Sequence, residues 1–371
     1  MVRSVGLEEE LLLVDPATGQ VRSAAPRVLQ GQADPQDDAL PVEMELFRHQ
    51  VETASAPSTS LAAIGDDLRR ARRTAGEAAG AEGLALVACG VVPRASDGAV
   101  PSPDDRYRDI VDRFGALARA AGTCGMHVHV DVDSPEQGVA VIDRVAPWLP
   151  VLLAISANSP FYDDQDTGYS SWRAQVWSRW PTAGPAEPFG SLAEYRRVGE
   201  RLLASGAARD EGMLYFDARL GQGTPTVELR VTDVCTDVED ALLVAALARA
   251  LVERSVRAED AGETLPSWRV QELRAAQWRA SRDGVTGALL HPVTGETTAA
   301  REVLRVVRDE LADLLAEAGD LERVDDGLER VLARGGASWQ RSAYERGGTV
   351  RDVVLDLAAR TEATWADGAG P

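Results

Sequence analysis

The sequence predicts an α+β protein with a mostly antiparallel sheet. Segments with the period-2 alternation of strands concentrate in residues 1–235, whereas residues 236–366 show helical periodicity almost throughout. The candidate strands do not alternate regularly with helices, which argues against a doubly wound parallel sheet. No repeat or low-complexity linker divides the chain, so we predict a single domain over residues 1–371.

The first candidate elements come in the order strand, strand, helix, strand. Residues 5–14 alternate as a strand that ends in a turn, and residues 43–53 form a second candidate strand. Ser60 caps a helix that runs to about residue 80, and residues 84–92 are an apolar strand.

Residues 104–121 are expected to be helical, and residues 123–133 form a strand with alternating apolar and polar side chains. A helix then runs to about residue 157, broken by Pro147 and Pro150. The long irregular stretch 158–190 carries three tryptophans, which either pack in the core or form a lid.

Two more strands, residues 213–219 and 224–233, are expected to pair after a short helix. From residue 237 onward the chain is expected to be amphipathic helix, most clearly at Val303, Val307 and Leu311.

Composition and charge limit the possible functions. All 39 cationic side chains are arginine, against 59 Asp and Glu, so the formal net charge is 39 − 59 = −20. Such an acidic excess repels nucleic acid and anionic membranes, and we expect neither as a partner. The lack of lysine excludes a Walker-A phosphate loop, a lysine Schiff base and a lysine general base.

The chain shows no signal for export or for membrane insertion. No window approaches 18 uncharged apolar residues, and residues 1–10 lack the apolar core of a signal peptide. Cys89, Cys124 and Cys235 are far apart and lie among apolar or strand-like neighbours. They are expected to be buried free thiols, and we predict a cytoplasmic protein.

Carboxylates recur on one face of the first two candidate strands. Glu8 and Glu10 point the same way, about 7 Å apart along the strand. In the second strand Glu43 and Glu45 share a face, and Glu52 lies in an otherwise apolar-to-small run. Such carboxylates repel one another unless water or a bridging cation separates them, so a solvated acidic edge remains an alternative.

Two further strands add imidazole and guanidinium groups. His127 and His129 lie on one face of residues 123–133, opposite an apolar face, which fits a metal or phosphate site as well as a satisfied core histidine. Glu228 and Arg230 share a face of residues 224–233 and could form a simple surface ion pair.

If these four strands join one sheet, its polar face gathers many hard oxygen ligands. Such a set suits Mg²⁺ or Mn²⁺ better than zinc. Because Mg²⁺ held by carboxylates usually serves a substrate phosphate, the pattern indicates ATP-dependent phosphoryl transfer without a phosphate loop. The residues concerned are Glu8, Glu10, Glu45, Glu52, His127, His129, Glu228 and Arg230.

An ordered set of motifs resembles the carboxylate–amine ligases of the glutamate–cysteine ligase type 2 family. The motifs are GLEEE at 6–10, ELFRHQVET at 45–53, CGMHVHV at 124–130, NSPF at 158–161, RAQVWSR at 173–179 and TVELRVTD at 226–233. They occur in order over about residues 4–365, and the ordered set is more specific than any single motif.

The resemblance implies a glutamine-synthetase-like fold: a curved antiparallel sheet forming an active-site funnel, with helices on its outer face. It implies one catalytic domain that binds ATP, glutamate and several Mg²⁺ (or Mn²⁺) ions. The implied metal ligands are Glu8, Glu10, Glu45, Glu52, His127 and Glu228. Arg230 would face the transferring phosphate, Glu52 would also be catalytic, and Arg173 and His129 would bind substrate, with the role of His129 left open.

The implied reaction joins the γ-carboxyl of glutamate to an amine, most directly cysteine, through a γ-glutamyl phosphate. Another amine acceptor remains an alternative, because no thiol pocket is evident in the sequence. A metal-dependent phosphoesterase built on His127 and His129 is a second alternative, and a non-catalytic acidic face that binds cations or a partner is a third. A homo-oligomer is possible.

Overall fold

The computed structural model of the chain describes residues 2–30, 42–95, 99–120 and 122–366. It confirms the predicted α+β class and the antiparallel sheet. The main sheet consists of β1 (Val5–Val14), β2 (Val42–Met44), β3 (Gln50–Ala54), β4 (Ala85–Val87), β5 (Gly125–Asp131), β8 (Ala218–Leu220) and β9 (Thr226–Asp233). Two small hairpins are formed by β6 (Phe161–Tyr162) with β7 (Gln165–Asp166), and by β10 (Ala288–Leu290) with β11 (Thr297–Ala299).

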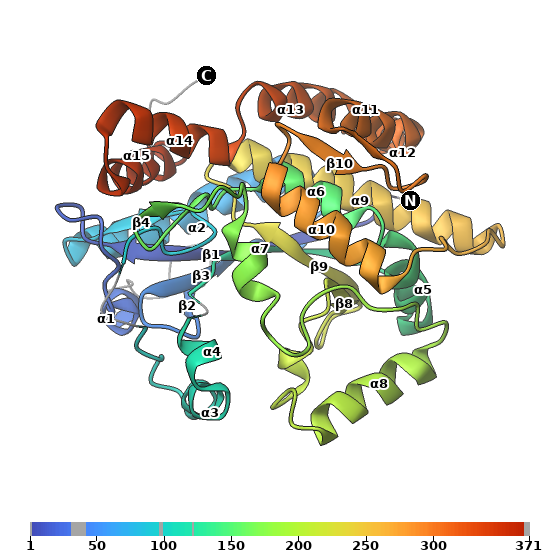
Figure 1. Cartoon of the computed structure of the whole chain (residues 1–371), viewed down its shortest axis with the longest axis horizontal. Coiled ribbons are helices and arrows are strands. Elements are labelled where there is room, and N and C mark those ends of the chain that lie inside the picture. The colour runs from blue at the N-terminus through green and yellow to red at the C-terminus, as the bar shows by residue number, and fades with distance from the viewer. Residues whose placement is uncertain (1, 31–41, 96–98, 121, 367–371) are drawn as a thin grey trace.

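The helices surround this sheet (Figure 1). They are α1 (Ala25–Gln30), α2 (Leu61–Ala81), α3 (Asp105–Phe114), α4 (Ala116–Arg119), α5 (Pro135–Val145), α6 (Leu149–Ser156), α7 (Trp172–Trp177), α8 (Leu192–Ala204), α9 (Val238–Asp260), α10 (Val270–Asp283), α11 (Ala300–Glu310), α12 (Ala312–Ala318), α13 (Leu321–Arg334), α14 (Gly336–Gly347) and α15 (Val350–Ala363), with a 3₁₀ turn at Glu211–Met213.

Strand pairing places the chemistry-bearing residues on one face of the sheet. The strand order is β2-β3-β1-β5-β9-β8, with β4 also paired to β1, and every pairing is antiparallel. Glu10 lies opposite Glu52, Glu8 opposite His127, and His129 opposite Glu228. Because directly opposed residues point to the same side, the polar side chains of four strands share that face.

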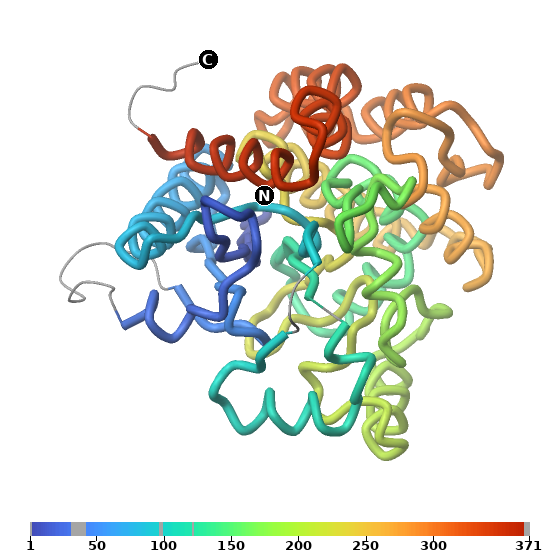
Figure 2. Tube along the Cα trace, turned by 60° about the vertical axis from the view of Figure 1, so that its left-hand side comes forward, coloured from blue at the N-terminus to red at the C-terminus, as the bar shows by residue number. Residues whose placement is uncertain are grey.

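The other face of the sheet carries the core. Val5, Leu7, Met126 and Val128 are buried there, in one hydrophobic cluster with residues of α2, α5, α6 and α9. Helix α9 is largely buried along its length, as expected for a helix in the middle of a core. Figure 2 shows the C-terminal helix α15 (red) beside the N-terminal part of the chain (blue), and Arg351 of α15 donates a hydrogen bond to the carbonyl of Ala17.

Several predicted elements are broken where the backbone turns. Residues 43–53 form two strands instead of one, because a turn closed by the Gln50 N–H and the Phe47 carbonyl separates β2 from β3. The expected helix 104–121 is split at Gly115, which adopts φ 57°, and residue 121 lies outside the described residues. The apolar strand predicted over 84–92 is only three residues long.

Two other expectations change in detail. The stretch 158–190 contains the β6–β7 hairpin and α7, and residues 213–219 begin as an irregular segment, so that β8 starts only at Ala218. The β10–β11 hairpin interrupts the helical C-terminal part. All three cysteines are buried and free, as predicted.

None of the helices in the described part of the chain alone has both the length and the apolar composition to cross a bilayer. Only α5 and α6 together, bent by 72°, meet both criteria.

Candidate active site

The polar face of the sheet forms the floor of a cavity of about 1000 Å³, which we call the acidic cavity. Helix α3 lies along one side of its mouth and α8 along the other (Figure 1). Its lining includes Glu8, Glu10, Glu45, Glu52, His127, Arg219 and Arg230 from the sheet and the loop before β3, with Arg106, Tyr107, Trp177, Tyr195, Arg196 and Tyr215 around them.

Glu8 joins the two histidines of β5. Its carboxylate lies 3.1 Å from His127 Nδ1 and 3.2 Å from His129 Nε2. Burial raises the pKa of Glu8, but hydrogen bonds from the two imidazoles outweigh it and hold that pKa well below its ordinary value. Burial, together with the nearby Arg230, lowers the pKa of His127 to about 4, so this imidazole is neutral at pH 7.

Glu10, Glu45 and Glu52 form a second group, in which carboxylates repel one another. Burial and the charge of Glu45 raise the pKa of Glu10 to about 8. Burial and the neighbouring Glu45, Glu10 and Glu8 raise the pKa of Glu52 well above its ordinary value. The Gly125 N–H donates to Glu10 at 2.6 Å, and no guanidinium of the described residues lies within ion-pair distance of these three carboxylates.

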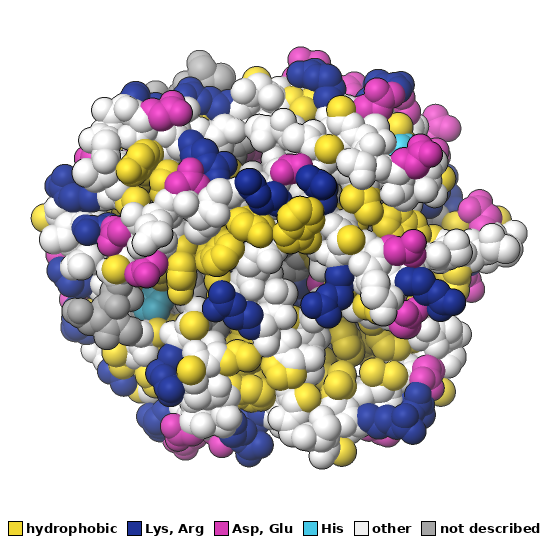
Figure 3. Space-filling view, viewed as in Figure 1, with side chains coloured by type: hydrophobic (Ala, Val, Ile, Leu, Met, Phe, Trp, Pro, Cys, Tyr) yellow, Lys and Arg dark blue, Asp and Glu magenta, His cyan; other side chains and the backbone are white. Residues whose placement is uncertain are grey.

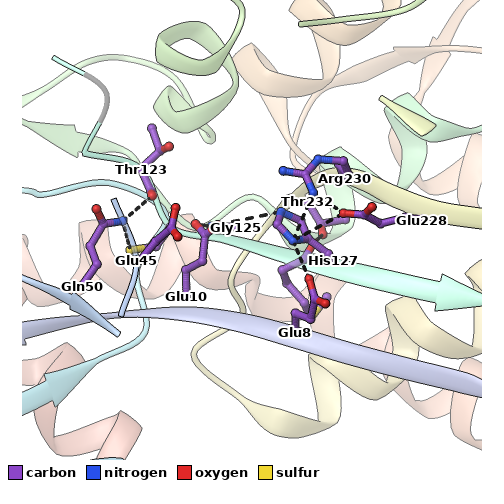
Figure 4. A network of polar contacts seen from close by, with 12 residues as sticks. Glu8, Glu10, Glu45, Gln50, Thr123, Gly125, His127, Glu228, Arg230 and Thr232 are labelled. Atoms are coloured by element: carbon purple, nitrogen blue, oxygen red, sulfur yellow. Dashed lines mark hydrogen bonds and ion pairs between the residues drawn. The ribbon is translucent and has the colours of Figure 1, made fainter. Parts of the chain in front are cut away.

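Glu228, in contrast, is fully paired. The Arg219 guanidinium donates to its two oxygens at 2.6 and 3.1 Å, and Arg230 donates to it as well. Burial raises the pKa of Glu228, but Arg230 and Arg219 outweigh it and keep the carboxylate ionised. Figure 4 shows Glu228 and Arg230 beside His127 and Glu8, with Glu10 and Glu45 on the other side of His127.

Arg230 is positioned by an irregularity that the sequence does not reveal. The pairing of β5 with β9 shifts between Met126, opposite Thr232, and Val128, opposite Leu229. The extra residue in β9 is a β-bulge, which interrupts the strict alternation predicted through Asp233. The Arg230 guanidinium lies 5.9 Å from the ring centre of Trp177 and 5.8 Å from that of Tyr215.

The donor set fits a divalent metal ion. Two groups of side chains bring one potential ligand atom each to within 4.8 Å of the others: Glu8 with Glu52 and His127, and Glu8 with His129 and Glu228. His127 Nε2 is buried and has no hydrogen-bond partner. Carboxylate oxygens with one or two imidazoles suit Mg²⁺ or Mn²⁺, and a cation would relieve the repulsion among the glutamates.

Most of the residues predicted from the sequence meet in this cavity, but Glu228, His129 and Arg173 do not line it. His129 lies just beyond its edge, where it contacts Glu8 and Thr226. Arg173 is only 1% exposed, and its guanidinium donates to the backbone carbonyls of Arg230 and Val231. Arg173 therefore does not line the acidic cavity, and its contact with a substrate carboxylate stays a prediction.

Sequence reasoning missed several residues around the cavity. Arg219 could have been found by counting back from the turn at residues 221–223, since it pairs with Glu228 in the hairpin register. Arg106 and Tyr107 come from α3, which no motif connects to the sheet, although the Tyr107 hydroxyl lies 3.4 Å from Glu45. Of the tryptophans in 158–190, Trp180 is buried in the core, whereas Trp177 lines the cavity.

Comparison with solved structures supports the fold. A bifunctional glutathione synthetase from Pasteurella multocida is 17% identical with a TM-score of 0.71, over 98% of this chain and 53% of that one, so this chain spans about half of that protein. A glutamate–cysteine ligase from Francisella tularensis, solved with AMP, is 13% identical with a TM-score of 0.65, over 99% and 90% of the two chains. The fold is that of the glutamine-synthetase-like carboxylate–amine ligases.

Comparison of sequences identifies the family. A protein of Nocardioides sp., provisionally named glutamate–cysteine ligase 2-1, is 54% identical over 374 residues, which cover 99% of this chain and 98% of the relative. The family model described as glutamate–cysteine ligase family 2 matches residues 4–356. The chain belongs to glutamate–cysteine ligase family 2.

Proposed function

We propose that this protein is an ATP-dependent ligase that joins the γ-carboxyl of L-glutamate to an amine, with L-cysteine as the acceptor and γ-glutamylcysteine, ADP and phosphate as products. The observation that carries the proposal is the acidic cavity itself. Four glutamates of the sheet and the loop before β3, together with His127 and Arg230, line a space large enough for two substrates. Family membership and the AMP bound to the Francisella ligase support a nucleotide substrate.

In this proposal Glu8, Glu10, Glu45, Glu52, His127 and Glu228 hold Mg²⁺ or Mn²⁺. Bound there, the ions supply charge neutralisation for the triphosphate. Glu10 and Glu52, whose pKa values are raised, would lose their protons on binding the cation.

Arg230 stabilises the transferring phosphoryl group. Its guanidinium is buried and held by Glu228, and the strength of that pairing raises its pKa, so it keeps its charge close to metal ions. The γ-carboxylate of glutamate attacks the γ-phosphate to give an acyl phosphate and ADP, and the amine then displaces phosphate to form the amide. Positioning and charge neutralisation account for most of the catalysis in such a transfer, so no lysine is required.

The same proposal assigns one catalytic domain to residues 1–371 and a cytoplasmic location. All candidate metal ligands come from one sheet and the loop that leads into β3, which supports a single domain. Three buried free cysteines are typical of a reducing compartment.

Mass spectrometry of the products tests the proposal. The enzyme is incubated with ATP, Mg²⁺, L-glutamate and a mixture of amino acids and amines. We expect γ-glutamylcysteine, with one ADP and one phosphate for each amide formed. A γ-glutamyl adduct of another amine, with none of cysteine, would refute cysteine as the acceptor, and ADP release without any amide would refute the ligase.

A further inference from the structure

A second cavity, of about 320 Å³, lies between α7 and α10, and we call it the α7–α10 cavity. Its polar lining comes chiefly from Arg173, Asp217, Arg274 and Gln277, with the indoles of Trp177 and Trp278 beside them. Helices α7 and α10 lie at the front of Figure 1, and Figure 3, drawn from the same side, shows hydrophobic and basic side chains around the middle of this face. None of the glutamates of the acidic cavity takes part in this lining.

Arg173 brings a buried positive charge that is poorly compensated. Its guanidinium donates to two backbone carbonyls at 3.2 and 3.4 Å, and its Nε has no hydrogen-bond partner. Among the described residues, no carboxylate is in ion-pair contact with it. Burial lowers its pKa, and the charges of Asp233 and Glu10 offset this only in part. A buried guanidinium with five donors and two long backbone contacts favours an added anion.

Asp217 brings the opposite charge to the same cavity. Its carboxylate accepts a hydrogen bond from the Gln277 amide, and no cation within the described part of the chain is in ion-pair contact with it. Burial raises the pKa of Asp217 to about 7, against the lowering by Gln277 and the more distant Arg173. This group is therefore suited to an added cation or hydrogen-bond donor.

The two charges line one cavity without pairing with each other. A ligand that carries both a carboxylate and an ammonium group offers a partner to each of them, whereas a simple anion or a simple cation would satisfy only one. Arg274 is exposed on α10 at the cavity and provides a second guanidinium for the carboxylate. Leu153, Val231 and the two indoles supply apolar walls for a side chain.

We propose that the α7–α10 cavity binds an α-amino acid as its zwitterion, with the ammonium group on Asp217 and the carboxylate on Arg173 and Arg274. This goes beyond the proposed function, because it adds a binding site outside the acidic cavity. It also gives Arg173 a carboxylate partner in a place that the sequence motif did not indicate.

Trp177 connects the two cavities. Its indole lines both of them, with the Arg173 guanidinium 5.5 Å and the Arg230 guanidinium 5.9 Å from its ring centre. An amino acid seated in the α7–α10 cavity therefore contacts a side chain that also packs against Arg230.

Isothermal titration calorimetry of the full chain with each common free L-amino acid other than glutamate, which the acidic cavity is proposed to bind, tests the proposal. We expect at least one to bind, and its N-acetyl derivative and its methyl ester to bind at least tenfold more weakly, because each lacks one of the two charges. Asp217→Asn and Arg274→Gln should each weaken binding at least tenfold. Asp313→Asn and Arg301→Gln, which change exposed residues of α12 and α11, are the matched controls and should bind as wild type.

Binding that Asp217→Asn and Arg274→Gln leave unchanged would overturn the proposal, as would the absence of binding by any amino acid. Circular dichroism checks that the variants are folded, and Asn at 217 keeps an acceptor for Gln277. Because binding can be measured without turnover, the proposed amino-acid site can fail while the ligase reaction stands. Equally, the ligase reaction can fail while the amino-acid site stands.

Steady-state kinetics distinguishes two roles for such an amino acid: the acceptor substrate of the ligase reaction, or an effector that is not consumed. If the amino acid is the acceptor, Asp217→Asn raises its KM at least tenfold and leaves the KM of ATP unchanged. If it is an effector, Asp217→Asn abolishes its effect on the rate and leaves the KM of the acceptor unchanged.

Discussion

Glu52 lies where the two groups of acidic side chains meet. It is opposite Glu10 in the sheet, and one of its oxygens lies within 4.8 Å of ligand atoms of Glu8 and His127. Glu52→Gln keeps the size of the side chain and removes the charge. We expect ADP formation with glutamate and an amine present to fall by about 100-fold or more, the scale for losing one preorganised electrostatic group.

Glu43→Gln is the matched control for this change. Glu43 is opposite Glu52 on the neighbouring strand β2, but it is exposed and does not line the acidic cavity. Its replacement should leave ADP formation unchanged. A folded Glu52→Gln variant that forms ADP at the wild-type rate would show that Glu52 is not required for catalysis.

Side-chain alternation accounts for much of what could be predicted at this scale. It placed Glu8 and Glu10 on one face because β1 is a regular strand, whereas the position of Glu52 opposite Glu10 follows only from the pairing of β1 with β3. It could not locate Arg173, because the position of a helix beside the sheet depends on long-range packing. Nor could it show that Glu9, between two glutamates of the acidic cavity, is completely buried on the other face.

The strand β1 and the helix α2 are joined by one buried ion pair. Arg72 donates to both oxygens of Glu9 at 2.6 and 2.8 Å and to the carbonyls of Cys235 and Thr236, and neither charged side chain is exposed. Glu9→Gln leaves the guanidinium buried without its counter-charge. We expect a loss of about 3–5 kcal/mol in the free energy of unfolding, measured by urea denaturation.

An exposed ion pair provides the comparison. Glu82→Gln breaks the contact of Arg27 with Glu82, whose side chains are 61% and 35% exposed, and should cost less than about 1 kcal/mol. Equal losses from the two variants would contradict the role given to the buried pair. Because Glu9 faces away from the acidic cavity, Glu9→Gln should bind nucleotide normally at temperatures where it is folded.

At the scale of elements, the sequence predicted regular segments better than their interruptions. The capped helix α2 was expected from Ser60, which does cap it through the Ala63 N–H. The bulge beside Arg230 was not expected, because apolar and polar residues alternate through it without a break. The position of a bulge depends on how a strand pairs with its neighbour. The alternation of residues within one strand carries no information about that pairing.

Metal binding should stabilise the whole molecule. A cation that binds the folded protein at hundredfold excess over its Kd adds about 2.7 kcal/mol. We therefore expect Mg²⁺ or Mn²⁺ to raise the Tm in a thermal-shift titration, and the double variant Glu10→Gln and Glu52→Gln to lose most of that rise. Wild-type Tm values that do not change with either ion would contradict the proposed ligand set.

Asp217 makes the stability of the molecule depend on pH. Its pKa of about 7 in the folded protein lies above the ordinary aspartate value near 3.9, so between these values the folded state binds more protons than the unfolded state. The contribution of Asp217 to stability therefore falls as the pH rises from about 4 to 7 and is constant above that range.

Asp217→Asn removes this dependence. Relative to wild type, the variant should become more stable as the pH rises from 5 to 8, as measured by urea denaturation at each pH. Asp313→Asn, a change of an exposed residue, should show a constant difference. A constant difference for Asp217→Asn as well would mean that its carboxyl titrates normally in the folded protein.

At the largest scale, the strand-rich and helical portions were predictable from periodicity, but the cavities were not. The acidic cavity needs α3 and α8 as walls, and the α7–α10 cavity needs a helix from the C-terminal part beside one from residues 172–177. Neither arrangement leaves a local pattern in the sequence.

The central place of β1 in the sheet has a consequence for biosynthesis. This strand leaves the ribosome before its neighbours β3 and β5, at residues 50–54 and 125–131, and β9 completes the site at 226–233. A nascent chain that has been synthesised to about residue 200 already carries Glu8, Glu10, Glu45 and Glu52 but not yet Arg219 or Arg230. The mutual repulsion of these four glutamates opposes early closure of the sheet, so folding of this face should follow synthesis of β9.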